Sequence, residues 1–328
     1  LNDNPAAIPD TVSIDTENPT VAIDIVETAL SDGLNSSQVT FVFSETPVGF
    51  DASDITAVGG TISGLATDLV TDPSGKTWTA TFTADDGYSG AGSVTVNAGQ
   101  FTDAALNDNL AASDTVAIDT GNPTATIVVT DDALRAGETS LVTITFSEAV
   151  SDFDNSDLVV SNGMLSPVSS SDGGVTWTAT FTPTADLESP VNVITLQDAS
   201  VVDGSNNPNI GSIDSNTFAI DTLRPTVTID IVETALSDGL NSSQVTFAFS
   251  EVPVGFDASD ITAVGGTISG LAADLVTDPS GKTWTATFTA DDGSTGTGSV
   301  TVDAARFTDA ALNDNPAAIP DTVSIDTE

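Results

Sequence analysis

A seven-residue stretch divides this chain into repeats, and it reads Ile118-Asp119-Thr120-Gly121-Asn122-Pro123-Thr124. The stretch recurs as Ile14-Asp15-Thr16-Glu17-Asn18-Pro19-Thr20 and as Ile220-Asp221-Thr222-Leu223-Arg224-Pro225-Thr226, and a last copy begins at Ile325. Its Asp therefore returns about every 104 residues, which is the size of one small domain. A fixed period of this length predicts domains in tandem. The Pro fixes φ at each joint, so we expect stiff linkers.

The period divides the 328 residues into four parts. Residues 15–118, 119–220 and 221–328 are predicted to be three domains, and residues 1–14 the trailing strand of a missing preceding domain. The first 17 residues repeat the last 17 without a change, so we expect the chain to be a segment of a longer array. Residues 10–14 would then lack their own sheet, and we expect them to be disordered or paired with a neighbouring molecule.

Short strands of alternating polar and apolar residues fill each repeat. In the first repeat they are predicted at 20–26, 38–44, 55–58, 61–65, 68–70, 77–83, 93–96 and 115–118. In the second they are predicted at 141–147, 158–160, 175–182, 193–196 and 217–220, and the third repeat copies the first. About seven strands per 100 residues, without helical periodicity, are typical of an immunoglobulin-like β-sandwich. The predicted fold is all-β, with three tandem immunoglobulin-like β-sandwiches arranged end to end as an extended rod.

Each repeat contains one Trp within the same phrase, at Trp78, Trp177 and Trp284. A large aromatic at a fixed place in every repeat is typical of a residue that fills the core. We therefore expect these side chains to lie inside the sandwiches rather than to stack on a ligand.

The charge balance is strongly acidic, because 5 Lys and Arg stand against 48 Asp and Glu, for a net charge of −43. Such a chain is repelled by nucleic acid and by anionic membrane surfaces, so we expect no nucleic-acid partner and no direct membrane contact. The 39% apolar content still allows packed cores. We expect a monomer whose partners are its own neighbouring domains.

Histidine and cysteine are absent from the sequence. Disulfides therefore do not hold the domains, and the commonest ligands of transition metals are excluded. Histidine-based acid–base catalysis is excluded as well.

Acidic residues gather in loops that an immunoglobulin-like order places at the leading end of each domain, where the chain enters. For the first domain these residues are Asp15, Glu45, Asp51, Asp54, Asp103 and Asn107. For the second they are Asp119, Glu148, Asp154, Asp157 and Asp203. For the third they are Asp221, Glu251, Asp257, Asp260, Asp309 and Asn313.

A second acidic set falls in loops predicted at the trailing end of each domain, where the chain leaves. It comprises Glu27, Asp32, Asp85 and Asp86 in the first domain, Asp131 and Asp132 in the second, and Glu233 and Asp238 in the third. The trailing set of one domain should then face the leading set of the next.

Converging carboxylates repel one another unless they are protonated or bind a metal. Carboxylate and amide oxygens without His or Cys select hard cations, and Ca²⁺ accepts six to eight such ligands in flexible geometry. We therefore predict Ca²⁺ sites at the loops and joints. The alternative is that these residues form ordinary solvated turns, in which Asp is common. No EF-hand loop and no calcium β-roll repeat is present.

Catalysis is not expected. Paired carboxylates can hydrolyse glycosides, but here they recur in every repeat without an aromatic-lined cleft. Direct binding of ice or a glycan by the Thr-rich strands is an alternative, although Thr on a solvent-facing strand is ordinary β-propensity.

The phrases Phe43-Ser44-Glu45, Lys76-Thr-Trp-Thr-Ala-Thr-Phe82 and Phe101-Thr-Asp-Ala-Ala105, with the linker motif, carry a family resemblance. The chain resembles bacterial immunoglobulin-like repeats of giant surface adhesins of the biofilm-associated and RTX types. It is also similar to the calcium-rigidified extender region of the Antarctic bacterial ice-binding adhesin and its marine relatives. The resemblance covers essentially the whole chain.

The resemblance implies an extracellular stalk on a bacterial surface that holds a distal adhesive domain away from the cell. The runner-up is a module that itself binds a host or environmental glycan, protein or ice. The second domain has Val202-Asp-Gly-Ser-Asn-Asn-Pro-Asn209 where the first has an Asn107-Asp-Asn109 loop. We therefore expect its site to be weaker or differently built.

Overall fold

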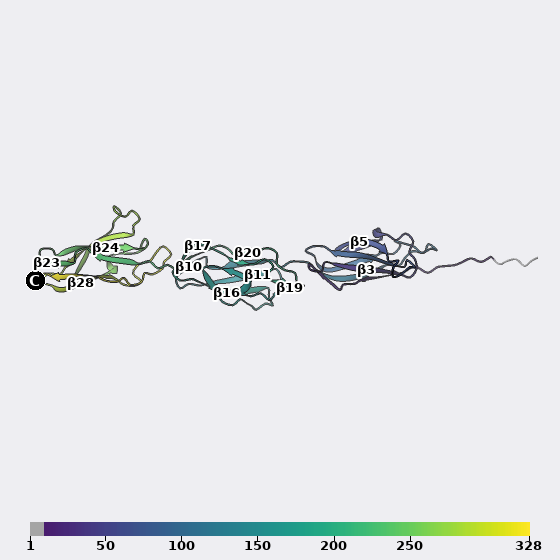
Figure 1. The fold of residues 1–328 in the computed structure, drawn as a ribbon, viewed down its shortest axis with the longest axis horizontal. Helices are drawn as coiled ribbons and strands as arrows, with labels where there is room; N and C mark the ends of the chain where they lie inside the picture. Colours follow the sequence, from purple (N-terminus) through teal and green to yellow (C-terminus); the bar gives the residue numbers. More distant parts are fainter. Residues whose placement is uncertain (1–9) are drawn as a thin grey trace, which may run out of the picture.

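The computed structural model describes residues 10–328 and contains three β-sandwiches that lie end to end (Figure 1). The predicted trailing strand falls partly on residues 1–9, which lie outside the described residues. Residues 10–14 form no strand, and Val12 and Ile14 are about four-fifths exposed. The same sequence forms a strand at the other end of the chain, where the third domain supplies a sheet for it.

The first domain consists of two four-stranded sheets. One has the order β1-β3-β6-β5, with strands Val21–Ile25, Ser36–Phe43, Thr77–Ala84 and Gly60–Thr67. The other has the order β2-β8-β7-β4, with strands Ala29–Ser31, Ala112–Asp119, Ser89–Val96 and Ile55–Val58. A 3₁₀ helix, η1 (Ala52–Asp54), precedes β4. All pairs are antiparallel except β2 and β8, which run parallel.

The third domain repeats this arrangement. Its sheets have the orders β22-β24-β27-β26 and β23-β29-β28-β25. The first comprises Val227–Ile231, Ser242–Phe249, Thr283–Ala290 and Gly266–Ala273. The second comprises Ala235–Ser237, Asp321–Asp326, Thr295–Val302 and Ile261–Val264, and η3 is Ala258–Asp260.

The second domain keeps one sheet and breaks the other into pieces. The sheet β14-β16-β11-β9 comprises Gly163–Leu165, Thr176–Pro183, Ser140–Phe146 and Ala125–Val129, with β15 (Ser169–Ser170) beside β16. The opposite side comprises β10 (Ala133–Arg135), β21 (Phe218–Asp221), β17 (Glu188–Asn192), β13 (Leu158–Val160), β18 (Ile194–Leu196) and β20 (Ile213–Asp214). The pair β12 (Val150–Ser151) and β19 (Val202–Asp203) lies apart, and η2 is Asn155–Asp157. A register shift between Ser189 and Asn192 accompanies the break between β17 and β18.

The alternating pattern fills the cores as the sequence predicts. Val39, Phe41 and Phe43 of β3 are almost fully buried, and Phe82 of β6 faces them. Trp78 is half-buried against this cluster, and its ring meets Phe50 edge-on at 5.4 Å. Its indole N–H donates to the Gly75 carbonyl at 3.2 Å, so the polar end of the side chain is satisfied at the rim. The prediction that Trp belongs to the core is confirmed.

Two local predictions are corrected. Residues 68–70 form a turn rather than a strand, because Asp68 accepts the N–H groups of Val70 and Thr71 and so bends the chain. The short strand β2 was not predicted, since three residues carry too little periodicity to be recognised.

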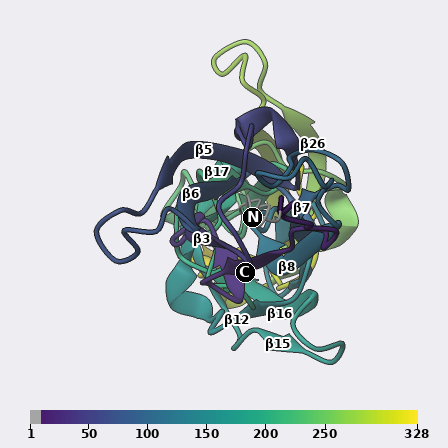
Figure 2. The same cartoon turned by 90° about the vertical axis from the view of Figure 1, so that its right-hand side faces the viewer.

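The loops that follow β5 and β26 project away from the long axis, as the end-on view shows (Figure 2). They contain Val70 and Val276, the most exposed large hydrophobic residues of the described chain. Over residues 10–328, no helix is long and apolar enough to cross a membrane.

Candidate metal centre

Three carboxylates meet at the leading end of the second domain. Asp119 ends the strand that enters the joint, Glu148 follows β11, and Asp203 ends β19. One oxygen from each lies within 4.8 Å of the others. Residues far apart in sequence therefore contribute negative charge to one small volume.

The loop after β19 holds Asp203 in place. Asp203 is 2% exposed, and its Oδ1 accepts the N–H groups of Ser205 and Asn207 at 2.7 and 2.9 Å. Its Oδ2 accepts the side-chain amide of Asn207 at 2.8 Å. The same amide donates to the Asp119 carbonyl at 2.8 Å, and the Ser205 hydroxyl donates to Asp119 Oδ2 at 2.9 Å. The loop therefore fixes the linker against the carboxylate that it buries.

The first domain has the same construction. Asp15, Glu45 and Asp103 also lie within 4.8 Å of one another. Asp103 is fully buried, and Asn107 donates to it from both its backbone and its side chain, at 2.9 and 2.8 Å. The amide of Asn107 also reaches the Asp15 carbonyl at 3.3 Å.

The third domain brings Asp221, Glu251 and Asp309 to the same region, but among the described residues this trio does not meet the 4.8 Å spacing of the other two. Asp309 is fully buried and accepts from Asn313, whose amide also reaches the Asp221 carbonyl. Glu251 Oε1 is buried without a hydrogen-bond donor. A buried carboxylate oxygen without a donor is costly unless a cation or proton compensates it.

The carboxylates of the second domain converge as those of the first do, but the loop around them is differently built. The Ser205 hydroxyl bonds Asp119, and Pro208 stands where the first domain has Asp108. The domain that departs is the third. Its trio is more widely spaced, although the sequence of its loop at 309–315 copies that of the first domain at 103–109.

The glutamates of all three clusters resist ionisation. Burial raises the pKa of Glu148, and the negative charges of Asp203 and Asp119 raise it further. Burial, followed by Asp103 and Asp15, raises the pKa of Glu45.

In the third domain, burial and then Asp309, Asp221 and Glu188 raise the pKa of Glu251, and Lys282 opposes them. This pattern is the signature of carboxylates that lack a counter-charge. Neither of the two ion pairs in the described chain, Arg135–Glu138 and Arg306–Asp303, includes a cluster residue.

The buried aspartate of the first domain behaves differently. Burial tends to raise the pKa of Asp103, but hydrogen bonds from the Asn107 side chain and from loop N–H groups outweigh it and hold the pKa below its ordinary value. Asp103 is therefore charged at neutral pH in spite of its burial.

Several predicted ligands are placed elsewhere. In each domain a pair of aspartates forms a capping box around its 3₁₀ helix, in which the first accepts a Ser N–H and the second accepts the N–H of the first. These pairs are Asp51 with Asp54, Asp154 with Asp157, and Asp257 with Asp260. Their carboxylates are occupied by local hydrogen bonds and do not belong to the two convergent groups.

Of the predicted trailing-end residues, Asp32 reaches the next domain. Its N–H donates to Asn207 Oδ1 at 2.8 Å, and its Oδ2 accepts the amide of Asn122 at 2.9 Å. Among the described residues, the other predicted trailing-end residues do not belong to the two convergent carboxylate groups. They are Glu27, Asp85, Asp86, Asp131, Asp132, Glu233 and Asp238.

The residues present fit a hard divalent cation. The donors are carboxylate, carbonyl and hydroxyl oxygens, which Ca²⁺ prefers, and Asp119, Glu148 and Asp203 supply three negative charges on a scaffold already fixed by hydrogen bonds. The unpartnered Glu251 Oε1 is an oxygen in need of a positive partner.

Sequence reasoning missed the linker position before each Pro. Asn18, Asn122 and Arg224 occupy it, and each donates to a backbone carbonyl of the leading-end loop, at Asp108, Pro208 and Asp314. The signal was present in the three quoted copies of the linker, in which this position changes from Asn to Arg.

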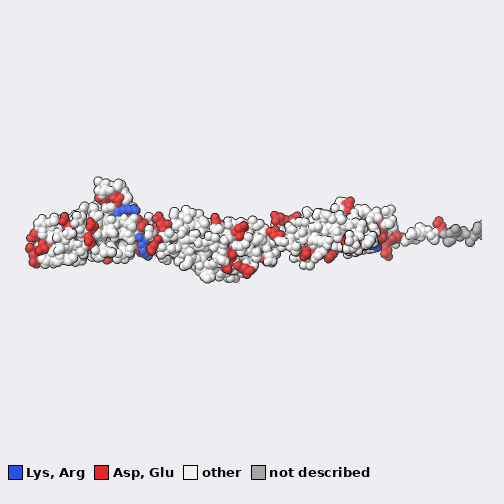
Figure 3. All heavy atoms as spheres, in the orientation of Figure 1, with Lys and Arg blue, Asp and Glu red and all other residues white. Residues whose placement is uncertain are grey.

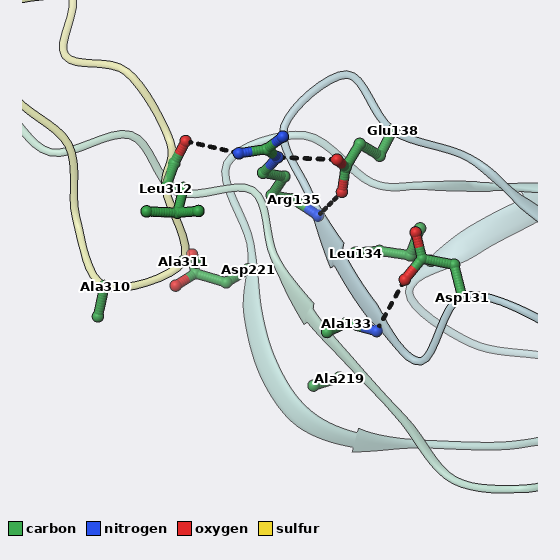
Figure 4. Close-up of a pocket in the computed structure, with 10 residues that line it drawn as sticks. All are labelled: Asp131, Ala133, Leu134, Arg135, Glu138, Ala219, Asp221, Ala310, Ala311 and Leu312. Carbon is green, nitrogen blue, oxygen red and sulfur yellow. Dashed lines mark hydrogen bonds and ion pairs between the residues drawn. The ribbon is translucent and has the colours of Figure 1, made fainter.

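Arg135 was missed as well. It lies at the joint of the second and third domains, above a cleft of about 480 Å³ that is lined by Leu134, Asp221 and Leu312 among others (Figure 4). Its guanidinium bonds Glu138 and reaches the Leu312 carbonyl across the joint. The sequence contains only five basic residues, so an Arg at this position is a clear exception to its acidic charge.

Solved structures that resemble the chain are tandem-domain proteins of low sequence identity. Invasin, a bacterial integrin-binding protein, is 16% identical over 94% of this chain, with a TM-score of 0.33. The chain spans 60% of the length of that structure. The adhesin InvE of Yersinia pseudotuberculosis is 14% identical, with coverage of 84% of this chain and 74% of that one and a TM-score of 0.26.

The I9–I11 tandem of titin is 8% identical, with coverage of 94% of this chain and all of the titin fragment and a TM-score of 0.29. None of the curated proteins matches the sequence. The model of the bacterial Ig-like domain family, however, matches residues 15–118, 119–220 and 221–325. The chain therefore belongs to the bacterial Ig-like domain family, of which it contains three consecutive members.

Proposed function

We propose that this chain is an extender segment of a large bacterial surface adhesin, stiffened by Ca²⁺ at its joints and located outside the cell. In this role it projects a distal adhesive domain, as the resemblance to extender repeats of RTX and ice-binding adhesins implies. The observation that carries the proposal is the convergence of linker Asp119 with Glu148 and Asp203. An ion bound by these three carboxylates would hold the linker directly against the second domain.

The proposed mechanism is electrostatic. Without a cation, three carboxylates within 4.8 Å repel one another, and the linker Asp is free to swing away. A bound Ca²⁺ attracts all three and holds the linker against the loop that contains Asn207. Binding to the folded state alone also adds RT ln(1 + [L]/Kd) to its stability. Extracellular modules commonly bind with Kd of about 10⁻⁴–10⁻³ M, which suits seawater or host fluids.

Small-angle X-ray scattering of residues 1–328 in millimolar Ca²⁺ and in EDTA tests this function. A narrow, extended distance distribution in Ca²⁺ that broadens and shortens in EDTA is the expected result. An unchanged profile, together with no heat of Ca²⁺ binding by calorimetry, would mean that the acidic loops are solvated turns.

Direct ligand binding is a second candidate, favoured by one observation. The loops after β5 and β26 project their apolar tips into solvent, and Val70 and Val276 are 93% and 92% exposed. Lone exposed hydrophobic residues are common, so the stalk remains the better-supported function. Loss of surface binding in a Val70→Ser/Val276→Ser variant with unchanged Ca²⁺ response would favour the second candidate.

A further inference from the structure

The two joints of this chain are built from different residues. In the first domain β2 ends at Ser31 and Asp32 follows it, whereas in the second domain β10 ends at Arg135 and Ala136 follows it. The linker residue before Pro is Asn122 at the first joint and Arg224 at the second. The first joint thus offers a carboxylate where the second offers guanidinium groups.

One backbone contact is common to both joints. The N–H of Asp32 donates to Asn207 Oδ1 at 2.8 Å, and the N–H of Ala136 donates to Asn313 Oδ1 at 2.7 Å. The domains therefore dock in the same register, and the differences lie in the side chains around this bond. The replacement of Asp32 by Ala136 removes the trailing-end carboxylate that bonds across the joint.

At the second joint one arginine bonds across to the third domain, and the other anchors the linker to the same loop. Arg135 Nη1 donates to the Leu312 carbonyl at 3.3 Å, and Arg224 Nη1 donates to the Asp314 carbonyl at 3.0 Å. Glu138 accepts from Arg135 Nε at 2.8 Å and so orients its guanidinium toward the third domain. Both arginines donate hydrogen bonds to the loop that contains Asn313.

The charge distribution agrees with this difference. Two of the five basic residues of the chain lie at the second joint, and Arg135 bonds across it. On the face in Figure 3, blue side chains lie beside red ones near this joint, whereas the first joint shows red side chains. Glu188 faces the third-domain cluster from β17 and raises the pKa of Glu251, so carboxylates are still in excess beside the arginines.

We propose that Arg135, which bonds across the joint, and Arg224, which anchors the linker to the same loop, keep the joint between the second and third domains aligned when calcium is removed. The inference rests on the proposed function, because it contrasts this joint with a calcium-dependent first joint. A guanidinium is always charged and donates in fixed directions, so it needs no extracellular ion to act. The chain is then a rod with one ion-gated joint and one permanent joint.

Spin labels on introduced cysteines test each joint separately, since the natural sequence has no Cys. Val42 and Leu141 are exposed strand positions in the first and second domains, and Ala248 is the counterpart of Val42 in the third. Double electron–electron resonance is measured for the pairs 42/141 and 141/248 in Ca²⁺ and in EDTA. We expect EDTA to broaden the first distance distribution several-fold and to leave the second narrow.

An exchange of residues supplies the matched control. The variant Arg135→Ser/Ala136→Asp/Arg224→Asn gives the second joint the residues of the first, and its 141/248 distribution should become sensitive to EDTA. The reverse variant Ser31→Arg/Asp32→Ala/Asn122→Arg should make the 42/141 distribution insensitive. Unchanged thermal unfolding of each domain shows that the variants fold.

The outcomes separate the two proposals. Equal broadening of both distributions in EDTA overturns the arginine joint and leaves calcium stiffening intact. If EDTA leaves the 42/141 distance distribution unchanged, calcium stiffening of the joints is overturned. In that case, broadening of 141/248 in the Arg135→Ser/Ala136→Asp/Arg224→Asn variant still supports the arginine contacts, and an unchanged distribution overturns them.

Discussion

Asn207 Oδ1 accepts the backbone N–H of Asp32 at 2.8 Å, which is a direct hydrogen bond between the loops of two successive domains. The same side chain donates to Asp203 and to the linker carbonyl of Asp119. One fully buried amide therefore connects the preceding domain, the linker and the candidate metal site.

Replacement of Asn207 by Ala should destabilise the second domain by about 1–3 kcal/mol, because it leaves buried polar groups without partners. Urea denaturation measures this loss. Asn206→Gly is the control, since Asn206 has φ of 63° and Gly adopts that conformation freely. A loss of equal size in both variants would contradict the assigned role of the Asn207 amide.

Glu148→Gln should weaken Ca²⁺ binding by about tenfold or more, since it removes one of three converging charges. Without Ca²⁺ the same variant should melt at a higher temperature than the natural protein, because the repulsion is relieved. Calorimetric titration and thermal unfolding give the two readouts. Asp152→Asn on the other side of β12 serves as the control, because Asp152 is exposed and outside the cluster. Equal effects in the two variants would mean that net charge alone is responsible.

The response to pH has a definite sign. The raised pKa values of Glu45, Glu148 and Glu251 mean that the folded state holds protons that the unfolded chain releases at about its ordinary value of 4.5. In EDTA the free energy of unfolding should therefore fall as pH rises from that value through the raised pKa values. In a Glu45→Gln/Glu148→Gln/Glu251→Gln variant this part of the pH dependence should vanish. Thermal unfolding between pH 4 and 8 measures both profiles, and parallel curves would contradict the assignment.

Calcium affinity should rise with pH, whereas the free energy of unfolding in EDTA should fall. Protons and Ca²⁺ compete for the same three glutamates, so binding should weaken as pH falls toward 4.5. Titration calorimetry in buffers of different ionisation heat would reveal the released protons. Constant affinity across this range would mean that the glutamates are not ligands.

Gly266→Ala tests the packing between β26 and β27. An added Cβ would lie 2.4 Å from the Thr289 carbonyl oxygen and 2.6 Å from the Phe288 ring, so we expect a loss of about 1–3 kcal/mol. Gly239→Ala is the control, because an added Cβ there meets nothing within 4 Å. Comparable unfolding midpoints for the two variants would contradict the close approach.

The sequence predicts the sandwich well because the alternation of apolar and polar residues can be recognised within each strand. Alternation at Val39, Phe41 and Phe43 fixes which face is buried, and Trp78 marks the same place in each repeat. The turn at Asp68 was wrongly predicted as a strand, since its apolar Leu69 and Val70 imitate a strand while the bend comes from the Asp68 side chain.

The convergence of Asp15, Glu45 and Asp103 was predicted because immunoglobulin-like topology places their loops at one end. Asp51 and Asp54 lie in the same region but cap a 3₁₀ helix, and charge patterning alone does not distinguish a cap from a ligand. The contact of Arg135 with Leu312 could not be predicted, because it joins residues 177 positions apart through the docking of two domains.

The parallel pairing of β2 with β8 determines how each domain responds to force. The strand near the start of the domain lies beside the strand that ends it, with Leu30 opposite Ile118, and the second and third domains repeat this pairing. A pull on the two ends of a domain loads all three paired positions together in shear, whereas a hairpin would unzip one pair at a time. Resistance to such a pull is set by the rate of unfolding and not by equilibrium stability. The three-residue strands β2, β10 and β23 therefore lie on the path along which each domain carries a mechanical load.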